Sequence, residues 1–116
     1  MKNKIKPKVI ISPRFCKLMS VFINVYAITL YPFIISKEPL PVITYNHEKI
    51  HLVQQRELWV VGFYILYVWY WLKAVAIGKT GRDAYYAIPF EKEAYENEKN
   101  LKYLKTRKPH AWKGFI

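Results

Sequence analysis

The stretch from Trp59 to Gly78 constrains the folding of this chain most strongly, because its twenty residues carry a single charge, Lys73. The stretch is long enough for a helix that crosses the hydrocarbon core of a bilayer, which is about 30 Å thick. Its tyrosines and tryptophans are more typical of the membrane interface than of the lipid core. A chain of 116 residues has little else with which to cover it. We therefore expect an exposed apolar patch.

A pair of histidines precedes this stretch, in the sequence His47-Glu48-Lys49-Ile50-His51. On a helix, residues four apart lie on one face, so both imidazoles can bind a single Zn²⁺ at about 2.0–2.1 Å. Glu48 lies about 100° further round the helix, where it can act as the base in metal-assisted hydrolysis. Shuffling this composition gives an expected H-E-x-x-H count of about 0.005 per chain. The alternative is a helix whose histidines and glutamate are simply solvated.

A catalytic zinc site needs a third protein ligand, and the acidic residues are the best candidates. The remaining histidine and the single cysteine are His110 and Cys16. Four of the eight acids crowd together near the start of a predicted helix, and they are Glu91, Glu93, Glu96 and Glu98. Acids in a first turn also stabilise the helix dipole, but four acids exceed what that role requires. We therefore expect this cluster to contain a metal ligand.

The segment Glu91-Lys92-Glu93-Ala94-Tyr95 resembles the E-x-E-A-D ligand helix of M48-type metallopeptidases. More loosely, it resembles the E-x-x-x-D helix of the thermolysin-like gluzincins. In those families the first glutamate of the motif is the third zinc ligand, and the resemblance carries that role over to Glu91. Tyr95 stands where the families have aspartate. The carboxylate that would support a ligand histidine is then missing, or Glu98 or Glu93 replaces it.

The resemblance extends beyond these two motifs. Residues 46–58 and 85–98 together look like a group of short bacterial HExxH proteins, and the likeness covers residues 28–108. It implies a minimal zincin-like fold, with an HExxH helix and a second helix that bears the glutamate ligand. The extended metzincin pattern is absent, because Gln54 stands where that pattern has glycine.

Three further polar residues lie close to the motif. Asn46 has the side chain of a helix N-cap. Gln54 and Gln55 fall on or near the histidine face, one turn beyond the second histidine. They either hydrogen-bond a substrate or the metal ligands, or they form a polar edge of the helix.

The sequence predicts a single domain, mainly α with a small β-hairpin (α+β), over residues 1–116. Within residues 25–45, Pro32 restricts its strand to an edge or a bulge, and Val42 to Tyr45 is expected to return as a second short strand. The final helix is expected to begin at Pro89. The predicted regions are a basic tail (1–8), a strand and hairpin region (25–45), the HExxH helix with the aromatic apolar helix (46–77), and the Glu ligand helix (89–106).

A membrane span and a metal site that includes Glu91 exclude each other within one chain. An unbroken helix from His51 would end at Gly78, about 40 Å away at 1.5 Å per residue. The 13 residues onward to Glu91 could return only as nearly extended backbone, which cannot cross lipid because no water satisfies its polar groups. We favour the metal site, unless a second chain supplies Glu91. The helix then bends near Gly62, or an extended return over residues 84–88 follows the protein surface.

The charge balance indicates the kind of partner. Nineteen Lys and Arg residues against eight acids give a net charge of +11, which favours an anionic neighbour. A membrane surface fits best, through peripheral or monotopic association or a single span, and the alternative location is the cytoplasm. A nucleic acid is the least favoured partner, because the basic residues lie mostly at the two ends and no nucleic-acid-binding motif is present.

The sequence thus predicts a zinc-dependent hydrolase of the metallopeptidase type. His47, His51 and Glu91 would bind Zn²⁺, and Glu48 would be the catalytic base. By the family resemblance, the substrate is a peptide or protein. The alternative is a non-catalytic membrane-associated or interaction protein with a structural or vestigial metal site. A homo-oligomer is compatible with both.

Overall fold

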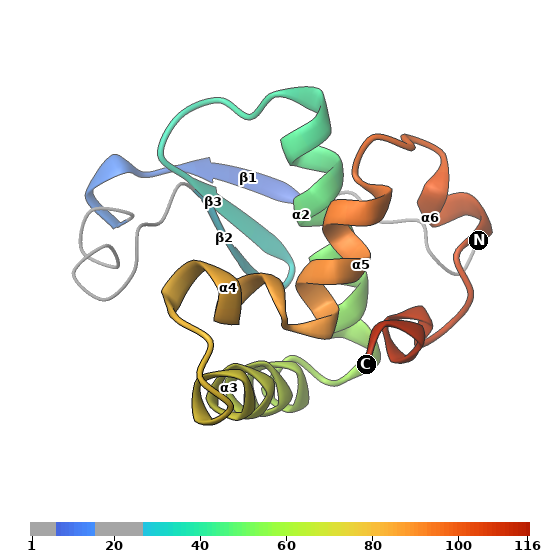
Figure 1. The fold of residues 1–116 in the computed structure, drawn as a ribbon. Helices are drawn as coiled ribbons and strands as arrows, with labels where there is room; N and C mark the ends of the chain where they lie inside the picture. Colours follow the sequence, from blue (N-terminus) through green and yellow to red (C-terminus); the bar gives the residue numbers. More distant parts are fainter. Residues whose placement is uncertain (1–6, 16–26) are drawn as a thin grey trace.

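The computed structural model describes residues 7–15 and 27–116 (Figure 1). A small sheet packs with a set of helices, which confirms the predicted mainly α, α+β class. The first six residues of the predicted basic tail lie outside the described part of the chain. The helices are α2 (Val42–Glu57), α3 (Val61–Ala76), α4 (Gly81–Tyr86), α5 (Pro89–Asn97), α6 (Tyr103–Thr106) and the 3₁₀ helix η1 (Ala111–Phe115).

The sheet has three described strands, β1 (Lys8–Ile11), β2 (Ala27–Leu30) and β3 (Phe33–Ser36), in the order β1-β3-β2. β1 runs parallel to β3, and β2 pairs antiparallel with β3. A hairpin is present, but it is not the predicted one, because β2 and β3 both lie within the part expected to form a single strand with Pro32 inside it. The turn is at Pro32, because a proline without an N–H group suits a turn better than a strand interior. Lys8 opens β1, so its assignment to a tail was wrong.

The helix that carries the histidines begins earlier than predicted. The expected short strand from Val42 to Tyr45 is instead the first turn of α2, which follows Pro41. The N–H of Tyr45 donates to Pro41 O at 2.8 Å, so the helix of the motif extends back over these residues, although Val42 and Ile43 stay exposed. Asn46 is therefore inside the helix and is not its N-cap. Its amide Nδ2 donates to the backbone oxygens of Glu98 at 2.8 Å and Asn100 at 3.1 Å, which ties α2 to the end of α5.

The predicted bend between the HExxH helix and the aromatic helix is present, and it lies just before Gly62. α2 and α3 are inclined by 111° across a break of a few residues. In that break Trp59 and Val60 adopt φ of 61° and 58°, a left-handed conformation that is costly for a β-branched residue. The chain then returns through α4, so the structure has the bend and not its alternative, an extended return over residues 84–88. The predicted helix over 89–106 is interrupted: α5 ends at Asn97, and α6 covers Tyr103–Thr106.

The lengths and hydropathies of the described helices bear on the predicted membrane span. No single described helix is both long enough and apolar enough to cross a bilayer. α2 and α3 reach the required length and mean hydropathy only as a pair, and that pair is bent.

Two apolar clusters form the core, and α5 contributes to both. One joins α2, α5 and α6, and its buried members are Ile50, Val53, Ala94 and Leu104. The other joins α3, α5 and η1, and its buried members are Phe63, Ile88, Phe90 and Trp112. α5 is therefore fixed on two sides, through Ala94 on α2 and through Phe90 on α3 and η1.

A network of buried charges joins Arg107, which follows α6, to α2 and α5. The Arg107 guanidinium, which is fully buried, donates to Glu57 at 2.8 and 3.0 Å and also to Glu93. Burial opposes ionisation of Glu93, but the hydrogen bonds and charge of Arg107 outweigh it and hold the pKa of Glu93 below its usual value. Tyr103 donates a further hydrogen bond to Glu93 at 2.7 Å.

Replacing Arg107 with methionine should destabilise the fold strongly. The substitution leaves the carboxylate of Glu93 buried without its cation, a change that costs about 3–5 kcal/mol in other proteins. Urea denaturation should show that loss in Arg107→Met. Lys108→Met, at the neighbouring exposed cation, should change the unfolding free energy by less than about 0.5 kcal/mol. Equal stabilities for the two variants would contradict the assigned role of the network.

Candidate metal centre

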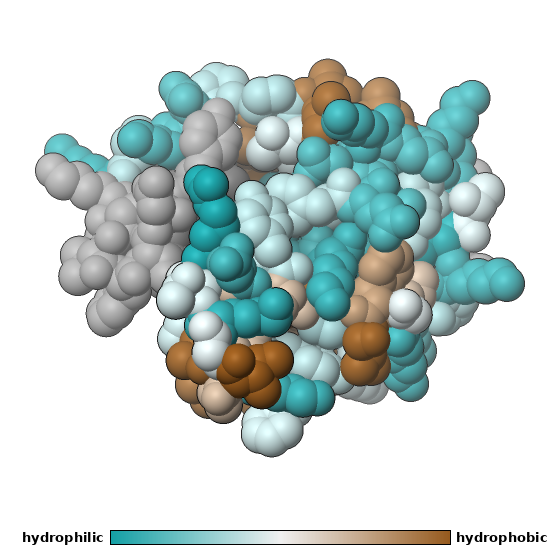
Figure 2. Space-filling model, viewed as in Figure 1, coloured by the Kyte–Doolittle hydropathy of each residue, from teal (hydrophilic) through white to brown (hydrophobic). Residues whose placement is uncertain are grey.

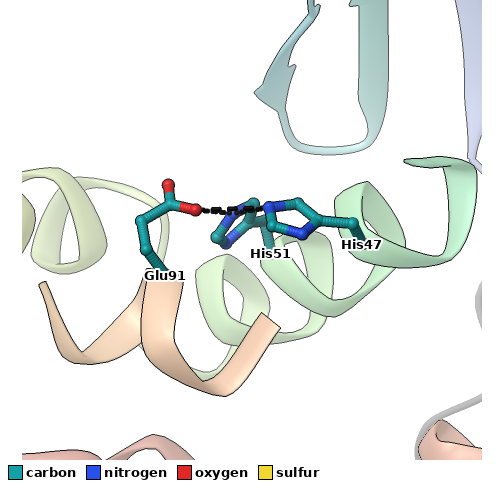
Figure 3. A group of neighbouring side chains, drawn as sticks. All are labelled: His47, His51 and Glu91. Atoms are coloured by element: carbon teal, nitrogen blue, oxygen red, sulfur yellow. Dashed lines mark hydrogen bonds and ion pairs between the residues drawn. The ribbon is translucent and has the colours of Figure 1, made fainter. Parts of the chain in front are cut away.

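His47 and His51 project from α2 toward Glu91 in the first turn of α5, as Figure 3 shows. Glu91 Oε1 lies 3.2 Å from Nε2 of His47 and 3.0 Å from Nε2 of His51. The two Nε2 atoms are 3.1 Å apart. All three residues are buried, with 4–5 % of their surface exposed. The bend between α2 and α3, followed by the return through α4, brings together residues forty positions apart.

These three atoms are arranged as ligands of a small cation. Ligands at about 2.0–2.1 Å from a tetrahedral ion such as Zn²⁺ lie about 3.3 Å from one another. The observed separations of 3.0–3.2 Å differ from that value by a few tenths of an ångström. The three residues can therefore hold a metal ion with small side-chain adjustments.

The hydrogen bonds on the far sides of the two rings determine the tautomers. His47 Nδ1 is 2.9 Å from Glu98 Oε1, and His51 Nδ1 is 2.8 Å from Gln54 Oε1. A carboxylate only accepts, so His47 Nδ1 must carry the proton. The Gln54 amide is oriented equally firmly, because its Nε2 donates to Phe90 O at 3.1 Å and to a Glu93 oxygen at 3.0 Å. His51 Nδ1 is thus also the donor.

In both neutral imidazoles, therefore, Nε2 presents a lone pair. These two lone pairs and a carboxylate oxygen converge on one point, where three acceptors would face one another with no donor. Such a group is stable only around a cation. A single proton can hydrogen-bond fully to only some of the three acceptors, whereas a divalent metal ion can bind all of them.

The electrostatics of the group agree with this requirement. Burial opposes a charge on His51, but the Glu91 carboxylate outweighs it and raises the pKa of His51 to about 9. Burial likewise opposes ionisation of Glu91, yet the charge of His51 and the close contacts with both histidine rings hold the pKa of Glu91 well below its usual range. In the absence of metal, a proton takes the place of the cation at neutral pH.

Tyr67 is a site residue that the sequence analysis missed. Its hydroxyl donates to Glu91 Oε2 at 2.7 Å, which turns Oε1 toward the histidines. Burial, followed by the charge of Glu91, raises the pKa of Tyr67, so the phenol keeps its proton. Tyr64, Tyr67 and Tyr70 recur at a spacing of three, which places them near one face of α3. That spacing was the available signal.

The predicted supporting residues fall into two groups. Glu98 and Gln54 contact the Nδ1 atoms of the candidate ligands, as described above. Glu93 reaches neither histidine and instead holds Gln54.

Tyr95, at the position of the family aspartate, packs its ring edge-on against His47, with centroids 4.4 Å apart. Gln55 lies away from the site and joins α2 to the sheet through Thr29 and the backbone N–H of Tyr31.

Glu48 differs from the other carboxylates near the site. It is half-buried, and among the described residues its carboxylate has no hydrogen-bond partner. Burial raises the pKa of Glu48, while the charges of His51 and His47 lower it. Glu48 therefore lies near enough to both histidines for their charges to affect its ionisation.

Comparison with protein-family models, curated proteins and solved structures finds no match to this chain.

Loss of the Glu98 carboxylate should weaken metal binding while leaving the three candidate ligands in place. Groups that orient a ligand histidine typically contribute 10–100-fold to metal affinity. Competition with a chromogenic chelator should show an affinity loss of about that size in Glu98→Ala. Glu96→Ala, which removes an exposed carboxylate from the same helix, should bind metal as the wild type does. Equal affinities for the two variants would rule out this role of Glu98.

Zinc binding should release protons in a pH-dependent way. The raised pKa of His51, about 9, means that the metal-free site carries a proton below that pH. A ligand nitrogen must lose its proton to bind a metal. Calorimetry in buffers of different ionisation enthalpy should therefore show about one proton released per zinc at pH 7. The release should decline as the pH rises past 9. A pH-independent release of zero would contradict the assignment.

Proposed function

We propose that this protein is a metal-dependent hydrolase, with a zinc ion held by His47, His51 and Glu91. The observation that carries the proposal is the convergence of two imidazole lone pairs and a carboxylate oxygen within 3.0–3.2 Å of one another. Two histidines and a glutamate form the ligand set of several catalytic zinc sites, in which a fourth position is left for water or substrate. A zinc ion in such a site supplies Lewis-acid activation of water and of a carbonyl group.

The chain's own residues would share the remaining work. Glu48 would accept a proton from the attacking water and pass it to the leaving amine. Its position near the histidines and its lack of a hydrogen-bond partner among the described residues support this role. Tyr67, Glu98 and Gln54 would keep the three ligands in fixed orientations. Tyr95 lies against His47 and is 39 % exposed, so this edge of the site is close to the protein surface.

The sequence resemblance to zincins supports a peptide or protein as the substrate. The same resemblance, together with the carboxylate base beside the ligands, favours zinc over iron(II), which two histidines and a carboxylate also bind in other enzymes. We also propose that the hydrolase works in association with a membrane, which the net charge of +11 and the aromatic stretch support.

A pair of measurements on purified protein tests the proposed function. Elemental analysis should find about one zinc per chain, and His47→Ala or Glu91→Ala should lose it. Glu48→Gln should retain the zinc, because Glu48 is not a ligand. It should also lose the hydrolysis of a fluorogenic peptide library by at least about a hundredfold, the range typical of general bases.

Two outcomes would contradict the proposal. Glu48→Gln with unchanged hydrolysis, or a wild type that binds zinc without hydrolysing any peptide, would favour the non-catalytic alternative with a structural metal. Stoichiometric iron in place of zinc would indicate a different reaction class.

A further inference from the structure

α3 has two apolar faces with different environments. Its inner face packs on the core through Phe63 and supplies Tyr67 to the metal centre. Its other face points away from the core. This α3 outer face consists of residues that are 41–68 % exposed, and they are Val61, Ile65, Val68, Trp69, Leu72 and Val75. Trp59, in the bend that precedes the helix, is 88 % exposed. Figure 2 shows hydrophobic side chains gathered over α3 at the bottom of the molecule.

A groove continues this face toward the sheet. Its volume is about 600 Å³, and it is lined by Leu30 of β2 and by Val60, Val61, Tyr64, Ile65 and Val68. Because the lining is almost wholly apolar, the groove suits a hydrocarbon chain better than a polar ligand.

The charges that flank this face in the sequence are mainly positive. From Leu58 to Arg82 the sequence contains no acid and three cations, Lys73, Lys79 and Arg82, and the exposed Asp83 follows them. Two copies of the protein that met through this face would bring these cations near one another, which opposes self-association. An anionic surface would instead attract them.

Most of the acidic side chains are not exposed at the protein surface. Five of the eight acids, including Glu91 and Glu93, lie in the site or in the Arg107 network and are not exposed, which leaves Glu38, Asp83 and Glu96 at the surface. Among the described Lys and Arg residues, Arg107 is the only buried one. Twelve of the described Lys and Arg residues are exposed, against these three acids, so the described surface is strongly cationic.

We propose that the α3 outer face rests on an anionic lipid surface, with α3 parallel to the membrane plane. The aliphatic side chains and the groove would receive acyl chains. Trp59 and Trp69 would lie at headgroup level, where tryptophan is enriched, and the flanking cations would pair with lipid phosphates. This inference rests on the proposed membrane association and is independent of the proposed hydrolysis. It places the metal centre, which contacts the inner face of α3, within about one helix diameter of the lipid.

Vesicle co-sedimentation of the zinc-loaded full chain tests the proposal. The wild type should bind vesicles of phosphatidylcholine with phosphatidylglycerol more strongly than vesicles of phosphatidylcholine alone, and salt should weaken the binding. Ile65→Glu should lower the partition coefficient by about tenfold or more, because it removes an inserted side chain and adds a charge. The matched control is Leu101→Glu, which adds the same charge at a leucine that is 55 % exposed on another part of the surface. It should stay within about threefold of the wild type.

Circular dichroism and zinc content should first confirm that both variants fold, with Trp69→Glu as a second outer-face variant. Equal binding of Ile65→Glu, Trp69→Glu and the wild type would overturn the proposal. So would equal binding to the two kinds of vesicle, or a lipid-free dimer that Ile65→Glu dissociates. The last outcome would assign the face to a second copy of this chain. None of these readouts requires hydrolysis, so failure here and failure of the proposed reaction can be told apart.

Discussion

The convergence of two imidazole lone pairs and the Glu91 carboxylate on one point is the interaction on which the rest of this structure depends. Glu98 and Gln54 fix the proton of each ring on Nδ1, so both Nε2 atoms are acceptors. Three acceptors at hydrogen-bonding distance repel one another unless a cation lies between them. A proton can therefore satisfy some of the three acceptors, whereas a divalent metal ion can bind all of them.

Much of the small interior serves to hold this arrangement. Gln54 keeps His51 in its tautomer only because Glu93 and the Phe90 carbonyl orient its amide. Glu93 in turn remains ionised inside the protein because Arg107 neutralises it, with Glu57 as the second partner. Tyr67 performs a similar task from α3. A chain of this size has a thin stability margin, so the use of these buried polar groups around one point supports a function for that point.

The sequence predicted the fold class and the grouping of His47, His51 and Glu91 better than the bounds of the individual elements, for physical reasons. The alignment of His47 with His51 follows from helix periodicity alone, and the excess of acids near Glu91 stands out in a basic chain. Tyr67 could not be chosen among ten tyrosines, because its role depends on the bend at Trp59 and Val60, a left-handed conformation for which neither residue has a local preference. Val42 to Tyr45 has the composition of a strand, but the helix of the motif extends back over it to Pro41. Asn46 likewise has a capping side chain that is used for a tertiary contact.

The central claim is that one cation is bound jointly by His47, His51 and Glu91. Anomalous diffraction at the zinc edge, from crystals of the zinc-loaded full chain, tests it most directly. A shared zinc ion should give one strong peak at about 2.0–2.1 Å from His47 Nε2, His51 Nε2 and Glu91 Oε1. The absence of a peak among these atoms, or a zinc ion bound elsewhere on the chain, would contradict it.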